Sequence, residues 1–378
     1  MKKKIIFILL SYLIIDFSIS NILFKKTSFW EYEDYVPKYW RISSQIYHHD
    51  LMPNIDVTEQ WGGKFKKRLI TNSLGFRDFT NRNVLKKNNK KRILLIGDSF
   101  IEGAGYDYVY TIGGLLQNYL GEEFEVLNSA VGSYSPSIYF FKTKHFLSEG
   151  YQFDYALIFL DISDIYDELF IKHYPNGNIL SEKTSEEQNA LKENFYSLGY
   201  FLRDNLVLFR SLYILSDKTE VLKNYLKFKF KASKDYEKNF FKTTKKDAMY
   251  YRMTNIDRGY WTFDESTFSH IKKGLNKSDK YLERLFYLLN DHNIKSYLII
   301  YPWPTQIQFG DARHEPYWKA FAKKNEINLV NLYQDFKSDD KRKFIFDNFI
   351  FGDIHWNKAG NIRILKALIR EIDILRKN

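Results

Sequence analysis

Short apolar runs alternate with amphipathic stretches from about residue 92 to the end of the chain. The apolar runs have the length of β-strands, and the stretches between several of them carry apolar residues at helical spacing. The expected strands are residues 92–97, 124–131, 154–163, 294–304 and 327–333. The expected helices are residues 111–121, 135–150 and 357–372. Strands that alternate with helices predict a parallel sheet in an α/β protein.

The third expected strand, residues 154–163, is apolar almost throughout rather than at every second position. A continuous apolar strand is typical of a parallel sheet that is covered on both faces. The pattern therefore predicts an α/β sandwich with helices on each side of the sheet.

The remaining segments are less regular. Residues 27–90 are aromatic and polar and form an N-terminal extension, in which Gly75 of "NSLGFRD" is expected to make a turn. The alternation of expected strands and helices also stops over about 165–286. We interpret this segment as a helical insertion at the carboxyl edge of the sheet. No linker rich in proline, glycine or serine separates a second domain, so residues 91–378 are expected to form one domain with this insertion.

Residues 1–26 form a separate N-terminal segment, with three lysines, an apolar run over 5–24 and two further lysines. The run is long enough to cross a bilayer, although Asp16 costs about 2.5–3.5 kcal/mol there. Only "SIS" at 18–20 hints at a cleavage site, which favours an uncleaved anchor over a signal peptide. The lysine distribution favours an amino terminus inside and a body on the periplasmic side of a bacterial inner membrane. The alternative is a buried amphipathic helix.

The amino-acid composition limits the kinds of chemistry that the chain can perform. The chain has 378 residues, 44% of them hydrophobic, so it can build a core, and it has no cysteine. Disulfides, cysteine-ligated zinc and thiol catalysis are therefore excluded. The formal net charge of +11 is compatible with binding to the phosphate groups of lipid or nucleic acid. Solvated loops explain the lysine runs better, and the expected anchor argues against a nucleic-acid binder.

Candidate chemistry lies where the expected strands end. In open parallel sheets, ligands bind beyond the carboxyl ends of the strands. Ser99 follows the first strand, Gly132 the second, and Ser163 with Asp164 the third. A serine at a strand-to-helix turn presents its backbone N–H at a helix amino terminus, where donors and the helix dipole stabilise an oxygen that becomes anionic.

A serine nucleophile needs a base, and His355 in "FGDIHWNKAGN" is the best candidate among 8 histidines. Asp353 lies two residues earlier, and in an extended segment both side chains would point to the same side. The carboxylate could then orient the imidazole, as in a catalytic triad. "GDS" alone is weak, because aspartate and serine commonly cap helices. The combination of strand, glycine turn and Asp-x-His before a final helix favours catalysis.

Three motifs, "IGDSF", "NSAVGSYSP" and "DIHWNKAGN", resemble those of the SGNH/GDSL hydrolase superfamily. The resemblance covers residues 92–378 outside the insertion. It implies a flavodoxin-like three-layer α/β/α sandwich with a parallel sheet. It also implies that Ser99 is the nucleophile, His355 the general base and then acid, and Asp353 the residue that orients it. The backbone N–H groups of Ser99 and Gly132 would form the oxyanion hole.

Two departures from the family pattern stand out. Ser163 occupies the position where the family has an asparagine in the oxyanion hole, and loss of one such donor can cost about 2.7–4 kcal/mol. The spacing Asp-x-His-Trp also differs from the usual Asp-x-x-His. It resembles the triad segment of bacterial alginate O-acetylation proteins, which handle acetyl groups on exported polysaccharide. In those proteins, however, the segment precedes the serine.

Cofactor motifs are absent: there is no Gly-x-Gly-x-x-Gly and no P-loop, so we expect no cofactor. A metal site built from Asp353, His355 and His314 is conceivable, but nothing fixes a third ligand. We therefore expect no metal.

Two tryptophans, Trp303 and Trp356, could stack on a sugar ring. The alternative, ordinary packing around the site, suits most large aromatic residues better. Asp161 and Asp164 could repel or bind a cationic group, or one of them could hold neighbouring loop amides.

These features predict a serine ester hydrolase that acts outside the cytoplasm on acyl, such as acetyl, esters of carbohydrate. One alternative is an O-acyltransferase that modifies a cell-surface polysaccharide. Another is a glycan-binding protein that keeps the fold without turnover. The expected partners are an acylated carbohydrate and the membrane, with no nucleic acid, and the sequence leaves the oligomeric state open.

Overall fold

The computed structural model describes residues 2–24, 40–61, 65–173, 179–180, 205–212 and 245–376, together with residues 202 and 215. The chain divides into two compact units. The first comprises Met1–Pro37 and Lys183–Lys245, and the second comprises Lys38–Glu182 and Lys246–Asn378. The second unit contains the sheet and every candidate site residue.

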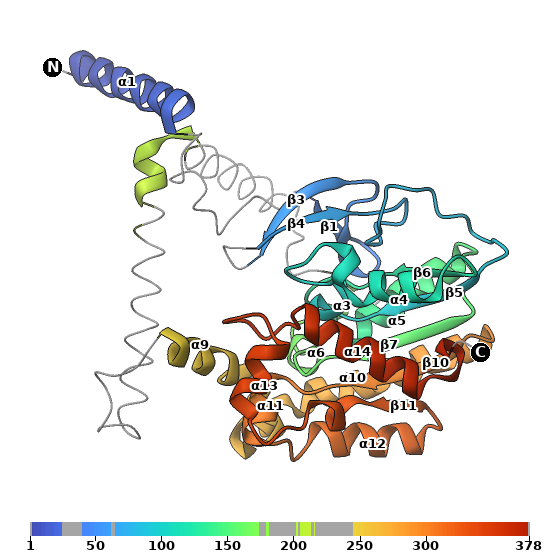
Figure 1. Cartoon of the computed structure of the whole chain (residues 1–378). Helices are drawn as coiled ribbons and strands as arrows, with labels where there is room; N and C mark the ends of the chain where they lie inside the picture. The colour runs from blue at the N-terminus through green and yellow to red at the C-terminus, as the bar shows by residue number, and fades with distance from the viewer. Residues whose placement is uncertain are drawn as a thin grey trace, which may run out of the picture. The chain divides into compact units, whose positions relative to one another are not determined.

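A five-stranded parallel sheet is the centre of the second unit (Figure 1). Its strands are β5 (Lys91–Ile96), β6 (Phe124–Asn128), β7 (Tyr155–Leu160), β10 (Lys295–Ile300) and β11 (Asn328–Asn331). They lie side by side in the order β11-β10-β7-β5-β6. In chain order this is the 2-1-3-4-5 arrangement of flavodoxin-like folds, whose strand order reverses between β5 and β7. The expected parallel sheet and all five of its strands are confirmed.

The central strand β7 is the most deeply buried part of the sheet. It pairs with β5 on one side and β10 on the other, and each residue from Ala156 to Leu160 is 0% exposed. This burial confirms the inference drawn from its unbroken apolar sequence.

Two pairs of helices cover the sheet. The helices are α4 (Ile112–Leu120), α5 (Pro136–Ser148), α10 (Glu265–Asp291) and α14 (Lys358–Glu371). Helix α4 contacts α14, and α5 contacts α10. Connections between neighbouring parallel strands are almost always right-handed. In the 2-1-3-4-5 strand order, right-handed connections place α4 and α14 on one face of the sheet and α5 and α10 on the other. The result is a sandwich of three layers.

Shorter elements connect the layers. The α-helices are α3 (Ser99–Glu102), α6 (Asp164–Asp167), α9 (Lys245–Thr254), α11 (Pro304–Phe309), α12 (His314–Lys324) and α13 (Lys341–Asn348). The 3₁₀ helices are η2 (Tyr108–Tyr110), η4 (Asp257–Thr262), η5 (Leu332–Phe336) and η6 (Asp373–Leu375), and the short strands β8 (Lys172–His173) and β9 (Ile179–Leu180) form a pair. Helices α11, α12 and α13 were not among the elements expected from the sequence.

The N-terminal extension forms two antiparallel hairpins. Strand β1 (Arg41–Ser44) pairs with β2 (His48–Leu51), and β3 (Asp56–Trp61) pairs with β4 (Phe65–Ile70). After β4, the backbone N–H of Arg77 donates to the carbonyl of Asn128 at the end of β6, over 3.2 Å. From Lys38 onward, the expected extension therefore belongs to the same compact unit as the sheet.

The expected insertion at 165–286 is shorter than the sequence suggested. Helix α10 begins at Glu265 and packs on α5 as part of a layer. Its hydrophobic face follows helical spacing, and Leu282 and Leu285 on that face are 0% exposed. Residues 181–201 and 216–244 of the expected insertion lie outside the described residues.

The first unit begins with α1 (Lys2–Ile19), followed by the π-helix η1 (Ser20–Phe24). None of the helices described by the structure is both long and apolar enough to span a membrane, so the expected transmembrane helix is not found. Helix α1 includes three lysines and Asp16. Asp16 is 7% exposed, and its carboxylate accepts hydrogen bonds from the backbone N–H groups of Val207 and Leu208 at 3.1 and 3.3 Å.

The turn expected at Gly75 is confirmed, and it offers a stability test. Gly75 has a φ of +75°, and a Cβ there would lie 2.4 Å from the carbonyl oxygen of Leu51. Gly121 has a similar φ of +76°, but its Cβ would meet nothing within 4 Å. We expect Gly121→Ala to lower the free energy of unfolding by about 1–3 kcal/mol, because its φ of +76° and ψ of −156° lie in a region that essentially only glycine adopts. Gly75→Ala should cost about 1–3 kcal/mol more through the clash. Urea unfolding of the two variants measures the free energy of unfolding that each one loses. Equal losses in the two variants would contradict the steric account.

Candidate active site

Ser99 lies immediately beyond the carboxyl end of β5. Asp98 caps the turn that follows, because its Oδ1 accepts from the backbone N–H of Phe100 at 3.0 Å. Ser99 is the first residue of α3, and it is half-buried. The sequence predicted a helix here, but α3 is a single turn of 4 residues. Its dipole is therefore small, and any stabilisation of an anion must come from individual donors.

His355 reaches Ser99 from the other end of the chain. It lies in the segment between α13 and α14, which is closed by a 2.8 Å hydrogen bond from the Ile350 N–H to the His355 carbonyl. The Oδ1 of Asn357 accepts from the Gly360 N–H at 3.0 Å and so starts α14 directly afterwards. In this position, the Nε2 of His355 lies 2.8 Å from the Oγ of Ser99.

Asp353 holds the other side of the imidazole. Its Oδ1 lies 2.5 Å from the Nδ1 of His355, and the same oxygen accepts from the backbone N–H of His355 at 3.0 Å. The segment is a turn and not the extended stretch assumed from the sequence. The aspartate reaches two residues forward because the turn folds it over its own backbone. The structure therefore brings the three predicted triad residues together in the hydrogen-bonded order Ser–His–Asp.

The charges around the imidazole of His355 suit a general base. Burial disfavours the imidazolium, but the charge and hydrogen bond of Asp353 outweigh burial and raise the pKa of His355 above its ordinary value. Charges on Asp98 and Asp161 act in the same direction. The ring also packs against Phe100, with ring centroids 4.6 Å apart. The imidazole is thus fixed in orientation and can take a proton from Ser99.

Gly132 lies beside Ser99, but its N–H group is already engaged. A Cβ at Gly132 would lie 3.5 Å from the Cβ of Ser99. The Gly132 N–H donates to the Oε2 of Glu102 at 2.7 Å. The predicted second oxyanion donor is therefore in place but occupied by a carboxylate in this structure.

Ser163 does not supply the third donor in this structure. Its N–H and its Oγ both donate to the Oδ1 of Asp161, at 2.8 and 2.7 Å. The hydroxyl that stands in for the family asparagine is thus engaged with the carboxylate two residues earlier.

The two tryptophans and Asp164 are buried. Trp303 is 0% exposed, Trp356 2% and Asp164 0%. The indole N–H of Trp303 donates to the Oδ2 of Asp161 at 2.7 Å, and Trp356 packs against Phe100. The structure accounts for these three side chains by packing and hydrogen bonding, and none of them offers an exposed face to a sugar.

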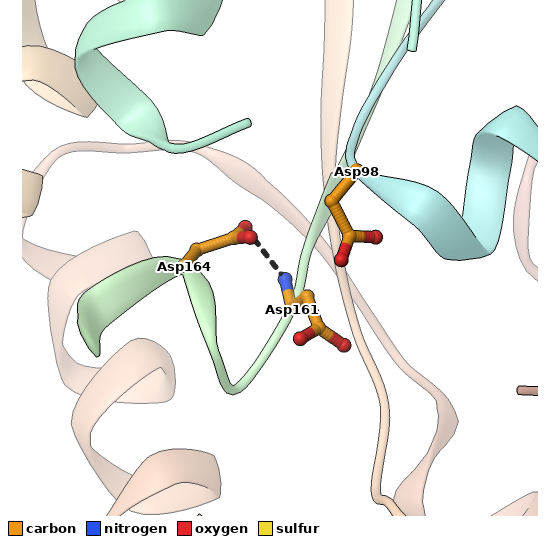
Figure 2. A group of neighbouring side chains, drawn as sticks. All are labelled: Asp98, Asp161 and Asp164. Atoms are coloured by element: carbon orange, nitrogen blue, oxygen red, sulfur yellow. Dashed lines mark hydrogen bonds between the residues drawn. The ribbon is translucent and has the colours of Figure 1, made fainter. Parts of the chain in front are cut away.

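Three buried carboxyl groups gather behind Ser99. They belong to Asp98 just after β5, to Asp161 just after β7 and to Asp164 at the start of α6 (Figure 2). One oxygen from each lies within 4.8 Å of the others. These residues could in principle hold a cation. Asp353, His355 and His314, which were considered as a metal site and not predicted to be one, do not form a ligand group among the described residues.

Hydrogen bonds account for most oxygens of the aspartate cluster. Asp161 accepts from Ser163 and Trp303, as described above. The Oδ2 of Asp164 accepts from the Asp161 N–H at 2.8 Å and from the Tyr139 hydroxyl at 2.7 Å. Asp164 thus holds a loop amide, one of the two roles expected for it.

Burial and mutual repulsion raise the pKa of two carboxyl groups of the aspartate cluster. Burial and then the charge of Asp161 raise the pKa of Asp98 to about 8. Burial together with the other two aspartates raises the pKa of Asp164 well above its usual range.

Sequence reasoning missed Glu102 and Arg41. Arg41 lies on β1, and its Nη2 donates to the Oε1 of Glu102 at 2.6 Å. The spacing "SFIE" was a usable signal for Glu102, because residues i and i+3 share one side of a helical turn. No sequence signal pointed to Arg41, which lies 61 positions before Glu102 and outside the motif-bearing region.

No protein-family model matches the sequence, and no curated protein matches it either. Solved structures that resemble the chain include acylhydrolases and esterases, the kind of protein whose motifs the sequence resembles. One is a putative acylhydrolase from Bacteroides fragilis, with 12% identity, a TM-score of 0.37, and coverage of 77% of this chain and 90% of that one. Another is an acetylxylan esterase from Geobacillus stearothermophilus, in a catalytic mutant form, with 13% identity, a TM-score of 0.37, and coverage of 76% and 96%.

A third is a carbohydrate acetylesterase from Sinorhizobium meliloti, with 11% identity, a TM-score of 0.35, and coverage of 76% of this chain and 100% of that one. Likeness at this level establishes neither activity nor substrate. The function must be argued from the hydrogen-bonded Ser99, His355 and Asp353 and from their surroundings.

The pKa of His355 generates a test of the triad. The imidazole acts as a base only when neutral, so acylation should be lost as the pH falls through its raised pKa. In Asp353→Asn the charge that raises this pKa is gone, and the acid limb of the pH–rate profile should move to lower pH. The limiting rate should also fall by about 10²–10⁴-fold. Asp347→Asn, which removes an exposed carboxylate on α13, is the control. An acid limb that stays in place in Asp353→Asn would contradict the assigned role.

Proposed function

We propose that this protein is a serine ester hydrolase of the SGNH/GDSL type. The observation that carries the proposal is the hydrogen-bonded series Ser99 Oγ, His355 Nε2 and Nδ1, and Asp353 Oδ1, with distances of 2.8 and 2.5 Å. A serine paired with an oriented histidine is the minimal device for nucleophilic attack on an ester carbonyl.

In the acylation step, the Oγ of Ser99 forms a bond to the carbonyl carbon while its proton passes to the Nε2 of His355. The negative charge of Asp353 stabilises the imidazolium. When the tetrahedral intermediate collapses, the bond to the leaving alcohol breaks, and His355 gives its proton to the alcohol oxygen. The product is an acyl-enzyme on Ser99 and a free hydroxyl on the substrate.

Deacylation uses the same groups with a second nucleophile. His355 takes a proton from water, the resulting oxygen attacks the acyl carbon, and the proton returns to Ser99 as the acid leaves. A sugar hydroxyl in place of water would give acyl transfer. Hydrolysis is the default, because transfer requires a site that holds the acceptor and excludes water.

For the substrate class, we propose acyl esters of carbohydrate, with acetyl as the first candidate. The proposal rests on the likeness of the Asp-x-His-Trp segment to proteins that handle acetyl groups on exported polysaccharide. The family resemblance of the serine block supports an acyl ester in general.

A glycan-binding protein without turnover is the second candidate, and a specific observation favours it. The Gly132 N–H and the Ser163 hydroxyl both donate to carboxylates. Two of the donors expected to stabilise an oxyanion are therefore committed elsewhere in this structure.

A fluorophosphonate probe tests the esterase proposal. The phosphorus is attacked by an activated serine, so the wild-type protein should be labelled on Ser99, as read by mass spectrometry of its peptides. Ser99→Ala should abolish labelling and hydrolysis of p-nitrophenyl acetate. Ser269→Ala, an exposed serine on α10, is the matched control and should react like the wild type. Glycan binding by a wild-type protein that hydrolyses no ester and is never labelled would instead support the second candidate.

We further propose that the protein acts outside the cytoplasm. Three lysines followed by the apolar run of 5–24 support this location. Alkaline phosphatase fused after residue 26 should be active in a bacterial host if the segment directs export, because the enzyme needs oxidising conditions to form its disulfides. An inactive fusion, present at the same level as an exported control fusion, would refute the location.

A further inference from the structure

A buried network of four charged side chains lies beside Ser99, and the triad makes no use of it. It comprises Glu102 on α3, Arg41 on β1, Glu59 on β3 and Lys67 on β4. The side chains of Glu59 and Lys67 are 0% exposed, Glu102 is 2% exposed and Arg41 20% exposed. The three residues outside α3 come from the N-terminal extension, which thus contributes directly to the surroundings of the serine.

Glu102 is bound from two sides in this network. Its Oε2 accepts from the Gly132 N–H at 2.7 Å and from the Nη1 of Arg41 at 3.0 Å. Its Oε1 accepts from the Nη2 of Arg41 at 2.6 Å. A Cβ on Gly132 would lie 3.5 Å both from this Oε2 and from the Cβ of Ser99. One negatively charged oxygen is therefore held by two donors, and one of them is the Gly132 N–H expected to bind the oxyanion.

An oxyanion hole binds the oxygen of a tetrahedral intermediate through a backbone N–H and further donors, and the Oε2 of Glu102 is bound in this way by the Gly132 N–H and by Arg41. We propose that the Oε2 of Glu102 occupies the oxyanion position in the resting protein, and that the Gly132 N–H and the Arg41 guanidinium are the donors that bind the substrate oxyanion once Glu102 withdraws. This inference rests on the proposed esterase function.

The withdrawal of Glu102 can be small. Rotation of its carboxylate removes Oε2 from the Gly132 N–H, while Oε1 keeps its hydrogen bond to the Nη2 of Arg41. Lys67, whose Nζ lies 3.9 Å from that Oε1, remains nearby as a counter-charge. The Nη1 group of Arg41 then becomes available to the substrate. No covalent bond changes, and the carboxylate stays paired throughout.

Arg41 fits the role of the missing side-chain donor better than Ser163. The Ser163 hydroxyl donates to Asp161, whereas the Nη1 of Arg41 already contacts an anionic oxygen next to Ser99. A guanidinium presents several N–H donors in one plane and stays charged, so it can serve Glu102 and an oxyanion in turn. The donor that the family takes from an asparagine after the third strand is supplied here by the first hairpin of the extension.

The carboxylate also opposes catalysis in the resting state. An oxyanion that develops beside an ionised Glu102 experiences like-charge repulsion, so removal of that charge should speed acylation. A residue that only supports the fold would have the opposite effect when replaced. The sign of the rate change therefore separates the proposed role from a structural one.

The test measures the rate of labelling by the fluorophosphonate probe in the full-length protein. Glu102→Gln should react about 10-fold faster than the wild type or more, because a neutral amide holds the Gly132 N–H less strongly than a carboxylate. Asp56→Asn is the matched control. It removes an exposed carboxylate on β3 that pairs with Arg68 rather than with Arg41, and its labelling rate should stay close to that of the wild type.

Two further variants keep the test valid if Glu102→Gln fails to fold. Glu102→Asp retains the charge for Arg41 but is one methylene shorter, so it should release Gly132 and also react faster. Arg41→Lys, which loses the planar pair of donors, should react about 10²–10³-fold more slowly. If Arg41 only clamped Glu102, this variant would react faster, and its role as an oxyanion donor would be refuted.

The outcomes separate this inference from the proposed function. Labelling of wild-type Ser99 with equal or slower reaction of both Glu102 variants would overturn the inference and leave the esterase intact. No labelling of the wild type or of any variant would overturn the esterase proposal itself. Labelling of the Glu102 variants alone would support both.

Discussion

The structure of the site depends on the hydrogen bond between the Nε2 of His355 and the Oγ of Ser99, which joins residues 256 positions apart. Such a bond requires both ends of the domain to be fixed relative to each other. The parallel sheet fixes Ser99, because β5 lies beside the reversal point of the strand order. His355 is positioned by the hydrogen bond from the Ile350 N–H to its carbonyl and by the Asn357 cap, which starts α14 two residues later. The chemistry is thus a consequence of where two buried elements end.

The charges around Ser99 are balanced in two different ways. Glu102 is balanced by cations: burial alone would raise its pKa, but Arg41 and Lys67 hold it well below its usual range. In the cluster of Asp98, Asp161 and Asp164, hydrogen-bond donors hold most of the oxygens, and among the charges only the imidazolium of His355 lowers the pKa of Asp98. Burial and the charge of Asp161 raise the pKa of Asp98 and so favour its neutral form.

The sequence predicted the sheet and the triad residues because both leave local signals. The five strands are apolar runs bounded by turns, and "GDS" and Asp-x-His stand at strand and helix ends. The contacts of Gly132 and Ser163 left no such signal, because their partners are set by which carboxylate lies nearest in space. Asp161 reaches Ser163 through a turn after β7, and Glu102 reaches Gly132 across two strand ends. Arg41 enters the site from a hairpin that no motif connects with catalysis. Residue types at strand ends could therefore be predicted, whereas the partners that decide which donors are free could not.

The arrangement of His355 weighs against a purely structural origin of the site. A histidine held between a serine and an aspartate is buried with both ring nitrogens engaged, which restricts its orientation and its protonation state. An apolar side chain could fill the same space without these constraints. Buried ionisable pairs also often contribute little net stability. A binding protein without turnover would need neither the 2.5 Å contact to Asp353 nor a raised pKa on the histidine. The occupied oxyanion position fits an enzyme at rest as well as it fits a binding protein. The oriented base fits the enzyme better, and it is the observation that favours the proposed hydrolase over the binding protein.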